Sequence, residues 1–228
     1  MTVLASEILS RVRSLLIDTE DTQRWSDAEL LQHLSDAQRT VAALAPEECS
    51  QVSVVQLAEG TRQALPSNGV SLLNVYRNMG IAGTTPARAI RLVRRELLDD
   101  QNPNWHSEAK VTVIYNYIYD PADATAFFVY PPSNGLGYIE INYCFTPAEI
   151  ALTSTAIALS DVFITPLTDY VMYKALQKDS DFAAGQQRAQ LHLQAFMLFL
   201  QGLDVAGQDS SPNNQMAPPN PQNKGSMK

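Results

Sequence analysis

Residues 24–41 read RWSDAELLQHLSDAQRTV, and this stretch contains both a helix start signal and a helical pattern of apolar residues. Ser26 and Glu29 form the S-x-x-E pattern of a capping box, in which side chains bind the free backbone N–H groups at a helix start. The apolar residues that follow lie three or four positions apart: Leu30, Leu34, Ala37, Val41 and Leu44. Because Pro46 cannot continue a helix, we predict an amphipathic helix between Ser26 and Pro46.

A second amphipathic helix precedes this one. Its apolar residues again share one face: Leu4, Ile8, Val12 and Leu15. A short polar connection at 18–24 joins the two helices, and Trp25 is placed to pack onto Leu30 as a hydrophobic staple. We therefore expect residues 1–46 to form an antiparallel helical hairpin.

Residues 50–148 change in character and predict a small antiparallel β region. Short runs rich in β-branched and aromatic residues alternate with turn signals such as Glu59-Gly60. The expected strands are Val52–Leu57, Leu72–Arg77, Ala89–Val93, Val111–Tyr119, Phe127–Tyr130 and Tyr138–Phe145, with one or two helical turns over 94–100. The turn PPSNGLG at 131–137 predicts that the last two strands form a hairpin.

Helical patterns return at 161–178 and 182–202. The last helix is apolar around more than one side, which an isolated surface helix would not be. Phe196 and Phe199 are our candidates for a subunit interface on this helix, although both could be buried within one subunit. The predicted fold class is α+β, with two N-terminal and two C-terminal helices around an inserted β region.

The C-terminal segment 203–228 is rich in Pro, Asn, Gln and Ser and offers little to bury. Such a composition predicts disorder in isolation, or folding upon a partner. The expected organisation is thus a domain at 1–202, with helices at 1–46 and 161–202, followed by this tail.

The overall charge argues against a nucleic-acid binder. The chain has 228 residues and a net charge of −8, and its densest basic group is Arg88, Arg91, Arg94 and Arg95. A DNA-binding surface normally carries a stronger basic patch. An acidic surface would instead suit a channel through which DNA slides, because it repels phosphate.

Charged residues make up only 18% of the chain. Such a low fraction is typical of a protein whose surface is hidden in an assembly, and also of a weakly charged monomer.

Cysteine usage and hydropathy predict a protein made in the cytoplasm. Cys49 and Cys144 belong to no CxxC motif, and we expect two reduced thiols and no zinc site. No apolar run approaches the roughly 18 residues of a membrane span. Arg11 and Arg13 interrupt the N-terminal apolar pattern, so we expect no signal peptide there.

We found no motif that carries catalysis, and we expect neither an enzyme nor a cofactor. The three histidines lack metal-ligand spacing, and His106 beside Trp105 is more typical of packing than of acid–base chemistry. No phosphate-binding loop or nucleophile elbow occurs. The adjacent pair Asp99 and Asp100 would point apart in a regular element, so it forms no ready glycosidase dyad.

Six segments in this order resemble the phage head-to-tail adaptor (connector) proteins of short-tailed phages, and the likeness spans roughly residues 8–200. These segments are RWSDAELLQHLSDAQRTV (24–41), EGTRQALP (59–66), RAIRLVRRELLDDQNPNWH (88–106), FFVYPP (127–132), IEINYCFTP (139–147) and DYVMYKALQKDSDFAAGQQRAQLHLQAF (169–196). Each segment alone is weakly specific, whereas their ordered combination is specific.

The resemblance implies a structural virion protein at the head–tail junction, with no catalytic residue. It implies a dodecameric ring that binds the portal protein above and nozzle or tail-fibre proteins below, with genome DNA passing through without specific binding. It also implies that the C-terminal segment reaches the portal. Our candidates for that contact are Asn213, Met216, Pro218 and Pro219.

Three other functions stay open at this point. A stopper or other neck protein is a related alternative, but stoppers are usually smaller and mostly β. A virion-associated cell-wall hydrolase would need an acidic pair, for which Asp99, Asp100 and Glu108 are candidates. A DNA-packaging accessory would bind duplex DNA in a salt-sensitive manner, which the net negative charge disfavours.

Overall fold

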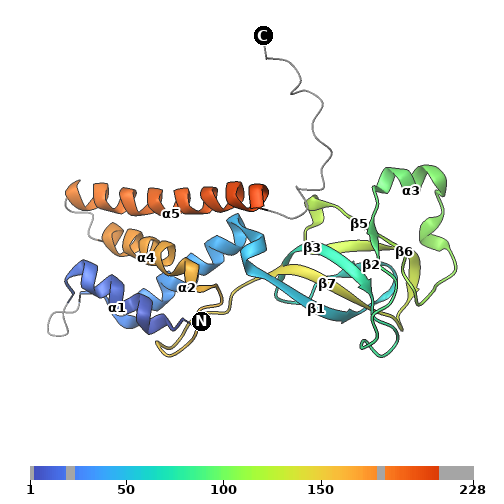
Figure 1. Cartoon of the computed structure of the whole chain (residues 1–228), viewed down its shortest axis with the longest axis horizontal. Helices are drawn as coiled ribbons and strands as arrows, with labels where there is room; N and C mark the ends of the chain where they lie inside the picture. Colours follow the sequence, from blue (N-terminus) through green and yellow to red (C-terminus); the bar gives the residue numbers. More distant parts are fainter. Residues whose placement is uncertain (1–2, 19–23, 179–182, 211–228) are drawn as a thin grey trace, which may run out of the picture.

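The computed structural model describes residues 3–18, 24–178 and 183–210. It is elongated, with a helical bundle at one end and a β region at the other (Figure 1). The predicted α+β class is confirmed, and the β region is inserted between the second and third helices of the bundle. Within the described ranges, no helix has the length and hydropathy needed to cross a membrane.

The bundle has four helices, two from each end of the chain, as predicted. They are α1 (Ala5–Leu16), α2 (Asp27–Leu44), α4 (Ile164–Lys178) and α5 (Ala183–Ser210). Helix α4 is central: it contacts the other three helices, whereas α5 has its main contacts with α4 alone. Helix α5 continues to Ser210, eight residues beyond the predicted end at 202, so the first part of the segment predicted as disordered is helical.

The β region consists of two sheets. One is antiparallel with the strand order β1-β7-β3, formed by Ser50–Gln56, Tyr138–Phe145 and Gly69–Asn78. The other has the order β2-β6-β5-β4, formed by Glu59–Ala64, Ala126–Asn134, Asn116–Tyr119 and Arg91–Leu92. Its β4–β5 pair is parallel, so the prediction of a purely antiparallel region is wrong in this detail. A hydrophobic core separate from that of the bundle contains residues of both sheets.

Three strand predictions need correction. The expected hairpin across 131–137 does not exist, because β6 and β7 belong to different sheets and the chain crosses between them at Gly135, which has φ +80°. Strand β2 was not predicted: Glu59-Gly60 was interpreted as a turn signal, whereas Gly60 lies at a bulge within this strand. Within the expected strand Val111–Tyr119, Val111 forms an isolated bridge to Ser133 and β5 begins only at Asn116, so β5 is shorter than expected.

Helix α3 (Arg95–Gln101) lies at the end of the molecule remote from the bundle (Figure 1), where a helical turn was predicted. A small third core beneath it contains Leu98, Trp105 and Ile118. The Trp105 indole N–H donates to the Asp99 carboxylate at 2.8 Å and fixes this end of the chain.

The return segment 146–160 binds along the bundle instead of crossing it as a loose loop. Its backbone N–H groups at Ile150 and Ala158 donate to the buried side chains of Ser35 (3.0 Å) and Gln38 (2.7 Å) on α2. Backbone hydrogen bonds near Thr155 also hold it to the start of α1. Buried polar residues on α2 thus replace the backbone partners that a sheet would provide.

Candidate functional site

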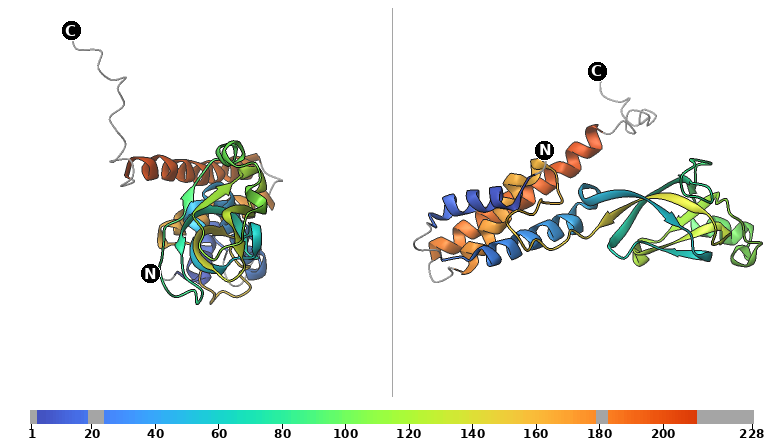
Figure 2. Two further views of the ribbon diagram at one scale, coloured as in Figure 1. Left: turned by 90° about the vertical axis from the view of Figure 1, so that its right-hand side faces the viewer. Right: turned by 90° about the horizontal axis from the view of Figure 1, so that it is seen from below.

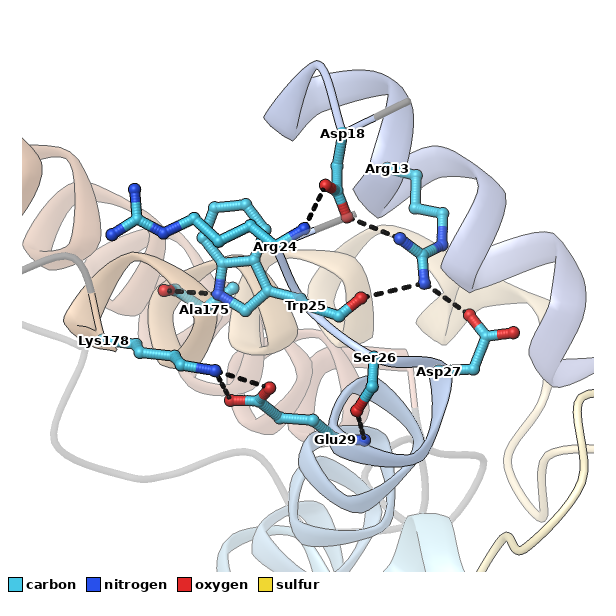
Figure 3. Close-up of polar contacts among 9 residues, drawn as sticks. All are labelled: Arg13, Asp18, Arg24, Trp25, Ser26, Asp27, Glu29, Ala175 and Lys178. Carbon is cyan, nitrogen blue, oxygen red and sulfur yellow. Dashed lines mark hydrogen bonds and ion pairs between the residues drawn. The ribbon is translucent and has the colours of Figure 1, made fainter. Parts of the chain in front are cut away.

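An arginine clamp closes the end of the bundle where α1 and α2 meet (Figure 3). The Arg13 guanidinium binds the carboxylates of Asp18 and Asp27 at 2.5 Å each, and it donates to the Trp25 carbonyl at 3.1 Å. The Asp18 side chain is only 1% exposed, and it also accepts from the backbone N–H of Arg24. Charge-assisted bonds of this kind fix the relative position of the two helices.

The same end of the bundle is joined to α4 (Figure 3). The Trp25 indole N–H donates to the carbonyl of Ala175 at 3.1 Å, and Lys178 binds the Glu29 carboxylate at 2.8 Å. Ser26 caps α2 as predicted, accepting from the backbone N–H of Glu29. Glu29 is therefore directed to α4 and not back to the cap. The clamp was not predicted, although the position of Arg13 within an apolar pattern was a signal for it.

The inner face of α5 holds both candidate interface residues. Phe196 is fully buried, with its ring 5.1 Å from that of Tyr170. Phe199 is half-buried and packs edge-on against Phe163 at 5.6 Å. Both rings therefore contribute to the core of their own chain, and their role at a subunit interface stays a prediction.

The outer face of α5 carries an exposed, nearly uncharged row. Leu191 and Leu198 are 64% and 66% exposed, and the neighbouring Met197 is 37% exposed. Arg188 is the only Lys, Arg, Asp or Glu between residues 185 and 203. Exposed leucines at such spacing, without charges between them, are typical of a helix that is covered in an assembly.

Two grooves flank α5 and α4. One, of about 970 Å³, lies against α5 and is lined by Ala189, Leu191 and five glutamines: Gln177, Gln186, Gln187, Gln190 and Gln194. The other, of about 480 Å³, lies between α1 and α4 and is lined by hydroxyl side chains together with Arg11, Leu15 and Asp169. Neither has the convergent catalytic groups of an active site; both are open surfaces suited to protein contact.

Two of the histidines and two of the carboxylates considered for catalysis have structural partners. His106 stacks on Trp105 with ring centroids 3.6 Å apart, and its Nδ1 lies 2.9 Å from the Thr61 hydroxyl. His192 Nδ1 lies 2.8 Å from the Asp169 carboxylate and joins α5 to α4. Of the hydrolase candidates, Asp99 binds Trp105, while Glu108 accepts from Asn102.

The two cysteines are free and buried where the bundle meets the β region. Burial raises the pKa of Cys49 to about 12, with further contributions from Cys144 and Glu48, and burial likewise raises the pKa of Cys144. Such thiols are protonated and weakly nucleophilic. In the part of the chain that the structure describes, no cluster of three or more His, Cys, Asp or Glu could hold a metal ion.

The four candidates for the portal contact, Asn213, Met216, Pro218 and Pro219, lie outside the described residues, so their placement stays a prediction. The family model described as SU10 adaptor protein matches residues 1–219, which includes the bundle, the β region and residues 203–219 of the C-terminal segment. No curated protein matches the chain. Because the match extends over nearly the whole chain, the protein belongs to the SU10 adaptor protein family and is a structural adaptor of a phage particle.

Proposed function

We propose that this protein forms a dodecameric ring at the head–tail junction of a short-tailed phage. In this proposal the ring binds the portal on one side and nozzle or fibre proteins on the other, and genome DNA passes through its lumen. The single observation that carries the proposal is the match of the adaptor family to residues 1–219. The exposed row on α5 supports it, because a ring subunit must keep surface free for its neighbours.

A closed ring requires a heterologous contact, in which two different surfaces of the chain meet. The outer row of α5, with Leu191 and Leu198, is one such surface. The groove between α1 and α4, which includes the half-exposed Leu15, is a candidate for the other. Phe196 and Phe199 then support the interface from within, by fixing α5 on its own bundle.

The distribution of charge suggests which part of the chain faces DNA. Residues 1–49 and 150–210, which include the helices of the bundle, carry fifteen Asp and Glu against seven Lys and Arg. Residues 50–149 are close to neutral, because they carry nine Asp and Glu against seven Lys and Arg. We place the bundle at the lumen, because an acidic wall repels phosphate and lets DNA slide. Basic substitutions on that wall should slow DNA passage.

The test is to mix the protein with the portal protein of the same genome and to measure mass and negative-stain images of the product. A ring stacked on the portal ring with matching twelve-fold symmetry supports the adaptor proposal. No association over a range of salt concentrations contradicts it. Deletion of 211–228, which leaves α5 intact, should abolish portal attachment without changing the fold; unchanged attachment would rule out the tail as the portal contact.

A further inference from the structure

The two sheets present four edges, and three of them are protected against pairing with another chain. Along β3 the pairing register to β7 shifts three times, and the outer edge of β3 is covered by backbone bonds to residues 87–90. Strand β2 has a bulge and carries the charged residues Glu59 and Arg62. Strand β4 has only two residues and is followed by Arg94 and Arg95. Bulges, charges and short length are the usual devices that prevent edge-to-edge association.

Strand β1 has none of these devices. Its seven residues, SQVSVVQ at 50–56, contain no charge and no proline. They pair with β7 in one continuous register without a bulge. Val52 and Val54 are 54% and 40% exposed, on the face of the sheet that points away from the β core. This is a straight, uncharged edge, the kind that readily accepts another strand.

The backbone groups on this edge have no partner in the described part of the chain. The Leu57 N–H donates to the Gly137 carbonyl at 2.9 Å, which directs residue 57 toward β7. Successive residues of an antiparallel strand direct their N–H and C=O groups alternately toward the partner strand and away from it. Since residue 57 faces β7, the N–H and C=O groups of Val52, Val54 and Gln56 point to the open side. No backbone hydrogen bond from another segment reaches these three residues within the described ranges.

We propose that, in the free protein before it joins the ring, β1 pairs antiparallel with β1 of a second copy about a two-fold axis at Ser53. In this register Val52 faces Val54 of the other copy, and Ser50 faces Gln56. On the face that carries these residues, apolar side chains thus meet apolar ones and polar meet polar, whereas on the opposite face Gln51 meets Val55. Every outward backbone group of both strands gains a partner. The three-stranded sheets of the two copies become one continuous sheet of six strands.

A second copy fits this edge better than the C-terminal segment does. Residues 211–228 contain four prolines, Pro212, Pro218, Pro219 and Pro221, and a strand added to an edge needs the N–H groups that proline lacks. The pairing is isologous, so it closes on two copies and cannot be the contact that repeats around a ring. It is therefore a separate surface from the outer row of α5.

Site-directed cross-linking tests the register. In a non-hydrogen-bonded antiparallel pair the Cα atoms lie about 4.5 Å apart, within disulfide range, so Ser53→Cys should give a covalent dimer when oxidised with copper phenanthroline. Gln51→Cys is the matched control on the same strand, because the two copies of residue 51 would lie roughly 14 Å apart. The wild-type protein, in which Cys49 and Cys144 are free and buried, gives the background level of cross-linking. Absence of the Ser53→Cys dimer, or equal cross-linking of both variants, would overturn the proposal.

Sedimentation of the uncross-linked protein gives a second test. Wild type should be dimeric, and Val52→Lys should be monomeric, because it places two like charges in the paired strands. Val113→Lys, at a residue of similar exposure outside β1, should remain dimeric. A wild-type monomer at every concentration up to its solubility would overturn the β1 pairing. Portal binding by Val52→Lys should persist, so a failure of the β1 pairing and a failure of the adaptor function are distinguishable.

Discussion

Arg13 is the residue whose loss should affect the bundle most directly, since it neutralises an aspartate that is almost fully buried. In Arg13→Met the buried Asp18 side chain, 1% exposed, loses its guanidinium partner. Breaking a buried pair in this way typically destabilises a protein by about 3 kcal/mol. We expect a decrease of that order in the free energy of unfolding, measured by urea denaturation.

The control for this prediction is Arg39→Met on the same bundle. Arg39 pairs with Asp36 at 3.8 Å, and both side chains are more than 40% exposed. Exposed pairs contribute about 0.5 kcal/mol or less. Equal effects of the two substitutions would show that the clamp adds no more than an ordinary surface pair.

Cys49 makes the stability depend on pH at the alkaline end. Burial raises its pKa from 9.0 to about 12, so between these values the unfolded chain loses a proton that the folded chain keeps. The free energy of unfolding should therefore fall as pH rises from 9 toward 12. In Cys49→Ala the decline should be shallower, while Cys144, Tyr117 and Tyr119, whose pKa values burial also raises, still contribute. Parallel pH profiles of the two proteins would contradict this assignment.

At the residue scale, local contacts were predictable and distant ones were not. The Ser26 cap depends on a backbone N–H three residues away and is confirmed. The partner of Glu29 is Lys178, which lies 149 positions further along the chain, and nothing in a local pattern indicates it. The hydrogen bond between Trp25 and Ala175 has the same origin: it exists only because α4 packs beside α2.

Helix α5 has two faces with different roles, and paired substitutions should separate them. Leu191→Glu with Leu198→Glu changes only the exposed row, so the free protein should keep its thermal stability and helical circular dichroism while ring formation on the portal is lost. Charges at the centre of a desolvated contact are strongly unfavourable.

The opposite face supplies the control. Phe196→Ala removes a ring that is fully buried against Tyr170, and such changes typically destabilise by about 3–5 kcal/mol. This variant should unfold at a lower temperature even without the portal. If the leucine variant still forms rings, the subunit interface does not include the outer face of α5.

At the element scale, helices were predicted more reliably than strands. The 3.6-residue period of α2 and α4 is a local property of the chain and is confirmed. The partner of β6 is not a local property: a turn with Gly135 joins β6 to β7 in sequence, yet the two strands enter different sheets. The sequence around Gly60 is typical of a turn, but in the structure Gly60 adopts a positive φ of 100° at a bulge within β2.

At the scale of the whole molecule, the insertion of a β region into a helical bundle was predictable, because two composition changes mark its ends. The division of that region into two sheets was not predictable, because it depends on pairings between strands far apart in sequence. The hydrophobic core of the bundle and the main core of the β region are separate, apart from Phe145, which contacts both. The right-hand view in Figure 2 shows the same division between bundle and β region.

This division predicts that the bundle folds without the insertion. Ser50 and Cys144 are direct partners in the β1–β7 ladder, so the chain enters and leaves the β region at adjacent points. Their Cα atoms are about 5 Å apart, a gap that a two-residue Asn-Gly turn can close. A chain in which this turn replaces residues 51–143 should therefore give helical circular dichroism and a cooperative thermal transition. A non-cooperative transition would show instead that the bundle needs the β region, and that the two cores form a single folding unit.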